Sequence, residues 1–296
     1  MHPGCGRFRR YPTALSASAA YARHERGFAA RPHAERSTAF GEQYMTRKDD
    51  YYNRAKQQGY RSRAAYKLKQ LDEAADLINE GDTVVDLGAA PGGWLQVANE
   101  LAGEAGTVVG VDLQRIDPIE GVETVRGDMT EDATREKVRA LVGEADVVIS
   151  DMAPNMTGEY SLDHARSVHL ARMAFETALD LLAPNGDLVA KVFEGPDTDD
   201  LRADIDREFE YVRTIHPDAS RDSSSELFMV AKGRLTAPVR EGDTLEVEID
   251  NLGDEGDGVA KVDGYTLFVS GAEPGDAPEV RVTDVKPRFG FAETLE

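Results

Sequence analysis

The hydrophobic and polar positions between residues 82 and 232 follow two alternating patterns. Short runs rich in β-branched apolar residues have the length of buried strands, and longer stretches between them repeat apolar residues every three or four positions. We therefore expect strands at 83–87, 107–111, 122–125, 146–150, 187–193, 210–216 and 226–232, and helices ending near 101 and covering 131–142, 161–182 and 199–208. This order predicts an α/β fold in which helices cover both faces of a mostly parallel, seven-stranded sheet.

A further helix is expected before the first strand, and a different pattern after the last one. Ser62 is a suitable N-cap, and apolar residues follow it at helical spacing: Ala64, Leu68, Leu71, Ala75 and Ile78. Residues 237–296 instead contain short strand-like runs separated by Gly, Asp and Pro. The second pattern predicts a small all-β barrel as a C-terminal domain.

Residues 1–44 show neither pattern and carry a net charge of +4. We interpret them as a disordered extension that precedes the native start at Met45. The Arg9-Arg10 pair suggests a twin-arginine export signal as an alternative, but the apolar stretch that follows is short and is broken by Pro12.

Composition narrows the class of protein. No apolar run approaches the roughly 18 residues that a membrane helix needs, and a single cysteine excludes an internal disulfide and a cysteine-based zinc site. The net charge is −21, and only 9 of the 34 basic residues are Lys. Such an acidic, lysine-poor chain is typical of a protein that works in molar salt, where screening reduces self-repulsion.

One segment, 47–69, has the opposite charge. It holds eight Lys or Arg against two Asp, with four tyrosines interleaved, and this mixture suits phosphates and stacked bases. The candidate RNA-binding residues in it are Arg54, Lys56, Arg61 and Arg63. The alternative is an ordinary solvated helix face. If the segment binds RNA in molar salt, we expect a shallow dependence of affinity on salt concentration.

The turn after the first expected strand has the features of a cofactor loop. It reads DLGAAPGGW from Asp86 to Trp94, and Asp112 follows at the end of the second strand, where it can accept hydrogen bonds from ribose hydroxyls. The loop is neither G-x-G-x-x-G nor a Walker loop, which makes a nicotinamide dehydrogenase the weaker alternative. An acidic strand end suits a cationic ligand without phosphate, such as S-adenosylmethionine.

These motifs resemble those of the FtsJ/RlmE family of ribosomal RNA 2′-O-methyltransferases. VVDLGAAPGGW, GVDL, RGDM, SDMAPNMTG and KVFEG occur in family order, between RSRAAYKL and SRDSSSELFMVAKG. The resemblance implies a Rossmann-like class I methyltransferase domain over 45–234, and 237–296 is similar to a TRAM domain, an RNA-binding module. With the acidic composition, it implies a halophilic archaeal source. Glu194 and Phe228 depart from the Gln and Tyr that relatives often have.

The resemblance also implies a set of site residues. The catalytic residues would be Lys67, Asp151, Lys191 and Glu226, and the contacts to S-adenosylmethionine would be Gly92, Trp94, Asp112, Asp128 and Asp151. Each has an ordinary reading when taken alone: Lys191 could extend along a strand end to solvent, Asp151 could cap a helix and Trp94 could pack in the core.

The chemistry supports these roles independently. A ribose hydroxyl is a weak nucleophile that must lose its proton as it attacks, and a neutral lysine can accept that proton. We expect Lys191 to be this base, because burial and the nearby charge of Lys67 lower its pKa. Asp151 would orient the amine, and Glu226 would hold the array together.

The expected activity is methyl transfer to the ribose 2′-hydroxyl of a uridine in 23S ribosomal RNA, either free or within the 50S subunit. We expect a cytoplasmic monomer that uses neither a metal nor a membrane. Two alternatives remain open: a tRNA 2′-O-methyltransferase, and a non-catalytic RNA-binding factor in ribosome assembly.

Overall fold

The computed structural model describes residues 50–220, 225–253 and 256–295. The expectations for 1–44 and for a start at Met45 lie outside these residues. Within the described ranges, no helix is both long and apolar enough to cross a membrane.

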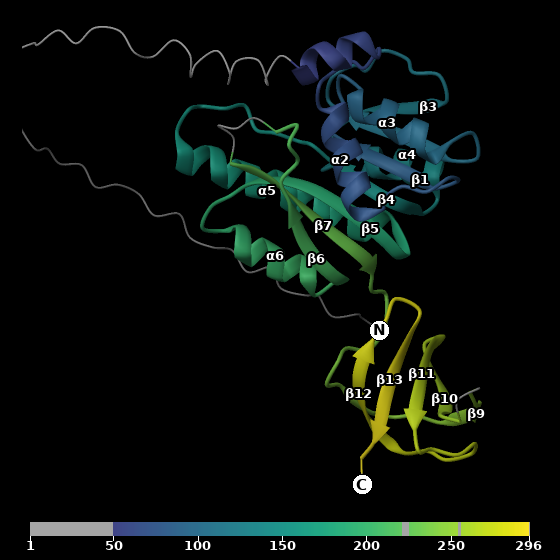
Figure 1. Cartoon of the computed structure of the whole chain (residues 1–296). Helices are drawn as coiled ribbons and strands as arrows, with labels where there is room; N and C mark the ends of the chain where they lie inside the picture. Colours follow the sequence, from purple (N-terminus) through teal and green to yellow (C-terminus); the bar gives the residue numbers. More distant parts are fainter. Residues whose placement is uncertain (1–49, 221–224, 254–255, 296) are drawn as a thin grey trace, which may run out of the picture. The chain divides into compact units, whose positions relative to one another are not determined.

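The first part of the described chain alternates helices and strands around one sheet (Figure 1). The elements are α2 (Ala65–Ala75), β1 (Thr83–Leu87), α3 (Gly93–Ala102), β2 (Thr107–Asp112), β3 (Val122–Arg126), α4 (Asp132–Val142), β4 (Ala145–Ser150), α5 (Tyr160–Leu181), β5 (Leu182–Phe193), α6 (Thr198–Asp206), β6 (Phe209–Ile215) and β7 (Glu226–Arg234). The strand order is β3-β2-β1-β4-β5-β7-β6. Only β7 runs antiparallel to its neighbours, so the mostly parallel seven-stranded sheet is confirmed.

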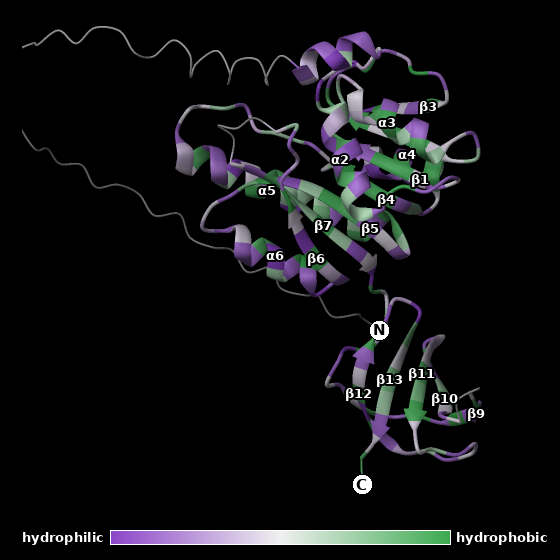
Figure 2. Ribbon diagram, viewed as in Figure 1, coloured by the Kyte–Doolittle hydropathy of each residue, from purple (hydrophilic) through white to green (hydrophobic). Residues whose placement is uncertain are grey.

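The apolar strands separate two cores, because successive side chains point to opposite faces of a sheet. In β1, Val84 packs with residues of α2 and α3, whereas Val85 packs with residues of α4, α5 and α6. In β5, Val189 lies in the same core as Val84, and Leu188 lies in the same core as Val85. The strands in the middle of the sheet are accordingly hydrophobic along their length (Figure 2).

Helix α2 differs from its expected bounds at both ends. Its N-cap is Ala64, with no side-chain capping bond, so Ser62 precedes the helix instead of capping it. At the other end Asp76 adopts a left-handed conformation with φ of 51°, and the Asp72 carboxylate accepts hydrogen bonds from the backbone N–H groups of Leu77 and Ile78. The apolar spacing continues beyond the helix because these two residues are also buried.

The connections of the sheet determine where a ligand can bind. From β1 the chain proceeds to β2 and β3 on one side of the sheet, and from β4 onward it continues on the other side. In open α/β sheets, ligands bind beyond the carboxyl ends of the strands at this reversal. Asp112 ends β2 and Asp151 directly follows β4, which places both at this edge.

The C-terminal part contains only strands among its described residues, which confirms the all-β prediction. They are β8 (Thr244–Glu246), β9 (Ile249–Leu252), β10 (Gly258–Val262), β11 (Tyr265–Ser270), β12 (Glu279–Val285) and β13 (Phe289–Thr294), in the order β8-β12-β13-β11-β10-β9. Alternate residues such as Leu267 and Val269 form its own hydrophobic core.

Candidate active site

Lys191 and Asp151 lie side by side because their strands are neighbours. Ser150 at the end of β4 is in register with Ala190 of β5, so the next residue on each strand is Asp151 and Lys191. The Lys191 Nζ lies 2.5 Å from the Asp151 carbonyl oxygen and 2.7 Å from its Oδ1. Lys191 is buried, with 6% of its surface exposed.

Lys67 and Glu226 reach the same place from α2 and from the start of β7. On β5 and β7, Lys191 is opposite Phe228, and Phe193 is opposite Glu226. Because side chains two residues apart share a face, Glu226 lies on the face of the sheet that Lys191 occupies. This face packs against α2, where Lys67 is buried.

An ion pair joins these two residues. The Lys67 Nζ lies 2.7 Å from Glu226 Oε1 and 3.6 Å from Asp151 Oδ1. Burial raises the pKa of the Glu226 carboxyl, but the charge and hydrogen bond of Lys67, a hydrogen bond with Ser220 and the charge of Lys191 together outweigh burial, and the pKa is lowered. Glu226 is therefore an ionised carboxylate that holds Lys67. The four side chains form one connected group.

The two contacts of Lys191 fix how its amine can be used. A neutral lysine amine has two N–H groups and one lone pair. With both N–H groups donated to Asp151, the lone pair is directed away from that residue. In this protonation state Asp151 orients the amine as an acceptor for a third group.

Lys191 and Asp151 line different cavities. Lys67, Lys191 and Glu226 line a cavity of about 550 Å³, together with Tyr160 and His164. Neither of these last two residues was expected from the sequence. The nearest sequence signal is the SDMAPNMTG motif, which ends at Gly158, two residues before Tyr160.

Asp151 lines a second cavity, of about 730 Å³, at the carboxyl ends of the strands. Asp112 and Asp128 line this cavity too. Asp112 Oδ2 accepts a hydrogen bond from the Ala90 backbone N–H at 3.0 Å, which ties the end of β2 to the loop after β1. Asp128 accepts from the N–H and hydroxyl of Thr130, and these bonds lower the pKa of its carboxyl. The Lys191–Asp151 pair therefore lies between the two cavities.

Comparison with known proteins agrees with this arrangement. The family model of FtsJ-like methyltransferases matches residues 60–234, and the TRAM domain model matches 238–295. The chain belongs to the FtsJ-like methyltransferase family. It is 65% identical over 263 residues to the ribosomal RNA large subunit methyltransferase E of Haloarcula marismortui, covering 85% of this chain and all of that protein.

Two more distant relatives match this FtsJ-like methyltransferase over nearly all of their own length. The ribosomal RNA large subunit methyltransferase E of Methanocella arvoryzae is 50% identical, over 84% of this chain and 97% of that protein. A crystal structure from Plasmodium falciparum, assigned as a ribosomal RNA methyltransferase, aligns with a TM-score of 0.54 and 27% identity, over 59% of this chain and 98% of that chain.

Two residues of the FtsJ-like loop lie outside the lining of both cavities. Trp94 is 3% exposed, its indole N–H donates to the Ala64 carbonyl at 2.8 Å, and its ring lies 5.7 Å from that of Phe228. Gly92 has a φ of 106°, and an added Cβ would lie 2.9 Å from an Arg61 nitrogen. Packing therefore explains why position 94 is Trp and position 92 is Gly. A contact to a cofactor remains a prediction for their backbone atoms.

The same loop contains a buried carboxyl that the protein leaves partly unsatisfied. Asp86 is 1% exposed, and its Oδ2 has no hydrogen-bond partner among the described residues. Burial, and then the negative charges of Asp151 and Asp112, raise the pKa of Asp86 well above its usual range. The Asp112 and Asp151 carboxylates on the cavity wall fit a ligand with a positive centre and disfavour one with phosphates.

The basic segment of this FtsJ-like methyltransferase is more internally bonded than its composition predicts. Arg61 donates to the carbonyl oxygens of Pro91, Asp117 and Pro118, and Arg63 donates to that of Ala219. The tyrosine rings also contact one another: Tyr51 and Tyr60 lie 5.4 and 6.0 Å from Tyr66. Arg54 and Lys56 are exposed.

Proposed function

We propose that this protein transfers a methyl group from S-adenosylmethionine to the ribose 2′-hydroxyl of a uridine in large-subunit ribosomal RNA. The observation that carries the proposal is the position of the Lys191–Asp151 pair between an acidic cavity and a second cavity. A methyl donor in one cavity and a ribose in the other would meet at this pair.

The acidic cavity would hold the cofactor. S-adenosylmethionine supplies a methyl group activated by a sulfonium. Asp112 would accept hydrogen bonds from the ribose of the cofactor, and Asp128, also on the cavity wall, would face its adenine. Asp112 and Asp151, both on this wall, favour the positive charge of the methionine part. Gly88 and Met152 both line this cavity. A side chain at Gly88, whose φ is 77°, would collide with Met152, so the glycine lets the loop pass close to Met152.

Lys191 would remove the proton of the attacking hydroxyl. In its neutral form the amine donates to Asp151 and presents its lone pair to the substrate, and it becomes an ammonium as the hydroxyl attacks. Asp151 then stabilises the new positive charge. Lys67, held by Glu226, supplies a fixed positive charge 3.6 Å from Asp151 Oδ1.

Ribosomal RNA is proposed as the substrate because of the relatives and of two surfaces. The relatives from Haloarcula and Methanocella are named as ribosomal RNA large subunit methyltransferases. Arg54 and Lys56 are the members of the basic segment best placed to meet phosphates, because Arg61 and Arg63 already donate to carbonyls. A ribosomal substrate also places the enzyme in the cytoplasm. The uridine and the 2′-oxygen rest on the resemblance of the motifs.

The TRAM-matching sheet offers an aromatic surface to RNA. Phe289 and Phe291 of β13 are 38% and 39% exposed, and Phe268 of β11 lies 5.8 Å from each of them. Exposed aromatic rings of this kind stack on nucleobases without depending on phosphate contacts, which suits RNA binding in molar salt.

Transfer of labelled methyl groups tests the substrate. The protein is incubated in molar KCl with labelled S-adenosylmethionine and either large ribosomal subunits or tRNA that lack the modification. We expect label in the large-subunit RNA, in a dinucleotide that resists alkaline cleavage because the 2′-oxygen is blocked. Label in tRNA alone would overturn the substrate. Cofactor binding without transfer to either RNA would favour a role in assembly.

A further inference from the structure

We propose that Tyr160 is the surface on which the base of the target nucleotide stacks while its ribose lies at Lys191. The inference rests on the proposed methyl transfer and adds a residue that positions the substrate. Tyr160 is the first residue of α5 and lines the same cavity as Lys191.

The cavity combines a reactive amine with an unusually exposed apolar wall. Tyr160 is 62% exposed and Met156 is 63% exposed, and both line it. Exposed apolar side chains that gather on the wall of one cavity mark a candidate site for a ligand or a partner. The other end of the wall is the charged group of Lys67, Lys191 and Glu226. A nucleotide has this same division, with a flat apolar base and a polar sugar.

The Tyr160 ring is held in place on its inner side. It lies parallel to the His164 ring, with an interplanar angle of 11° and centroids 6.3 Å apart, and its hydroxyl donates to the Glu194 carbonyl at 2.7 Å. His164 is itself fixed, because its Nδ1 lies 3.0 Å from the Phe193 carbonyl and its Nε2 accepts from the Asp197 backbone N–H at 3.3 Å. These contacts hold the imidazole in place through both of its nitrogens.

The loop before Tyr160 is fixed as well. The buried Asp163 carboxylate accepts hydrogen bonds from the backbone N–H groups of Thr157 and Gly158 and from the Thr157 hydroxyl. These bonds lower the pKa of Asp163, so the carboxylate stays ionised and the loop stays attached to α5. A ring fixed before binding loses little conformational freedom when a base stacks on it.

The burial of Lys191 determines from which side a nucleotide can reach its amine. With only 6% of its surface exposed, the amine is reached from the cavity and not from the outer surface of the protein. A nucleotide that leaves its stack can bring its ribose into this cavity together with its base. Stacking on Tyr160 would replace the neighbours that the base has lost.

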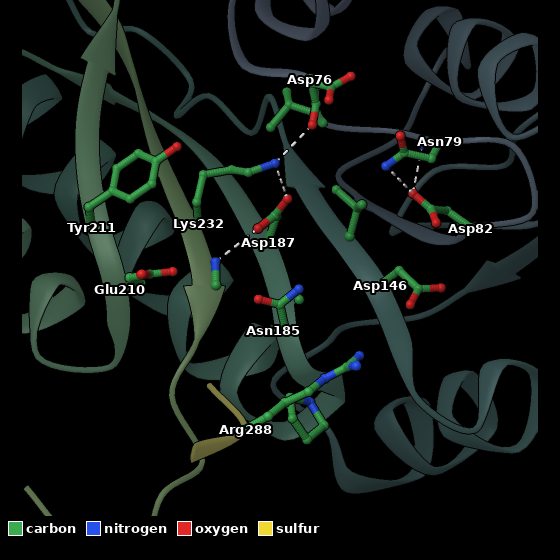
Figure 3. Close-up of a pocket in the computed structure, with 15 residues that line it drawn as sticks. Asp76, Asn79, Asp82, Asp146, Asn185, Asp187, Glu210, Tyr211, Lys232 and Arg288 are labelled. Carbon is green, nitrogen blue, oxygen red and sulfur yellow. Dashed lines mark hydrogen bonds and ion pairs between the residues drawn. The ribbon is translucent and has the colours of Figure 1, made fainter. Parts of the chain in front are cut away.

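Three tyrosine variants test this role. Tyr160→Ala removes the ring, and Tyr160→Phe keeps it while removing the bond to Glu194. Tyr211→Ala is the matched control, because Tyr211 is 45% exposed and lines an acidic cavity at the other end of β5, with Asp187 and Lys232 (Figure 3). We expect Tyr160→Ala to lower kcat/KM for the RNA about 10- to 100-fold with unchanged cofactor affinity, and the other two to stay within about threefold of the wild type.

A photochemical cross-link gives a readout that does not depend on turnover. A synthetic fragment of the RNA carries 5-iodouridine at the position that the enzyme methylates, and irradiation joins this base to a stacked aromatic ring. We expect the cross-linked peptide to contain Tyr160, in the wild type and in Lys191→Ala. A wild-type rate in Tyr160→Ala, or a cross-link elsewhere, would overturn the stacking role. Full activity of Lys191→Ala would instead overturn the proposed base.

Discussion

Lys191 and Asp151 lie 2.7 Å apart, Nζ to Oδ1, yet they line two different cavities. The pair therefore forms part of the wall between a site suited to a cationic cofactor and a site suited to a nucleotide. Methyl transfer needs the donor, the acceptor and the base within contact of one another. Neighbouring parallel strands provide this contact, since Ser150 and Ala190 are in register directly before the two residues.

The buried ion pair between Lys67 and Glu226 predicts strong coupling in stability. Glu226→Gln leaves the Lys67 charge without its nearest partner and should destabilise the fold by about 3 kcal/mol, the usual cost of breaking a buried pair. Lys67→Met should be destabilising as well, whereas the double variant should lose at least about 1 kcal/mol less than the sum. Chemical denaturation in molar KCl measures the free energy of unfolding of the wild type, the two single variants and the double variant.

The Lys67–Glu226 pair also predicts how the stability of the fold changes with pH. Because the pKa of Glu226 is lowered in the folded state, Glu226 makes its full contribution to folding stability above the pH range in which a free Glu titrates. The contribution is lost as the pH falls through the lowered pKa. The coupling between Lys67 and Glu226 should therefore shrink at acid pH. Additive effects at neutral pH would contradict the ion pair.

The raised pKa of Asp86 predicts that the stability of the fold decreases as the pH rises. Burial raises its pKa, so the folded protein keeps a proton that the unfolded chain releases above about pH 4. Stability is consequently lost as the pH rises from there toward the raised pKa. Asp86→Asn is neutral throughout, and its stability relative to the wild type should increase between pH 4.5 and 7.5. Thermal unfolding without cofactor measures this, and a difference that is constant with pH would rule out a raised pKa.

The phenylalanines of β13 predict RNA affinity that persists in salt. Replacing Phe289 and Phe291 together with Ala should weaken RNA binding about 10-fold or more in molar KCl, where phosphate contacts contribute little. Leu141→Ala is a suitable control because Leu141, on α4, is 46% exposed and far from β13 in sequence. Fluorescence anisotropy of a labelled RNA fragment measures the affinity. Equal affinities of the double variant and the control would remove the sheet from RNA binding.

Much of the fold could be predicted because apolar spacing determines it directly. The central strands of the sheet follow from short apolar runs such as 84–85 and 147–149, which are buried. The start of α2 could not be predicted in the same way. Ser62 is a favourable cap by type, but the backbone enters the helix only after Ala64, and local preference does not determine that geometry.

The candidate site, like the fold, could be predicted only in part. The order of the motifs placed Lys67, Asp151, Lys191 and Glu226 together, and the structure connects them through two strands and α2. The division of Lys191 and Asp151 between two cavities was beyond the sequence, because it depends on the loop between β4 and α5. The cationic character of Arg61 was visible in the sequence, but its bonds to three carbonyls were not.

The most direct test of the central claim is the single-turnover rate of Lys191→Ala beside the wild type, with saturating enzyme and large ribosomal subunits in molar KCl. Binding of S-adenosylmethionine and of RNA is measured in parallel. If Lys191 is the base, the rate should fall by about 10²- to 10⁴-fold while both affinities remain within a few fold of the wild type. A rate within a few fold of the wild type, with both ligands bound, would contradict the account.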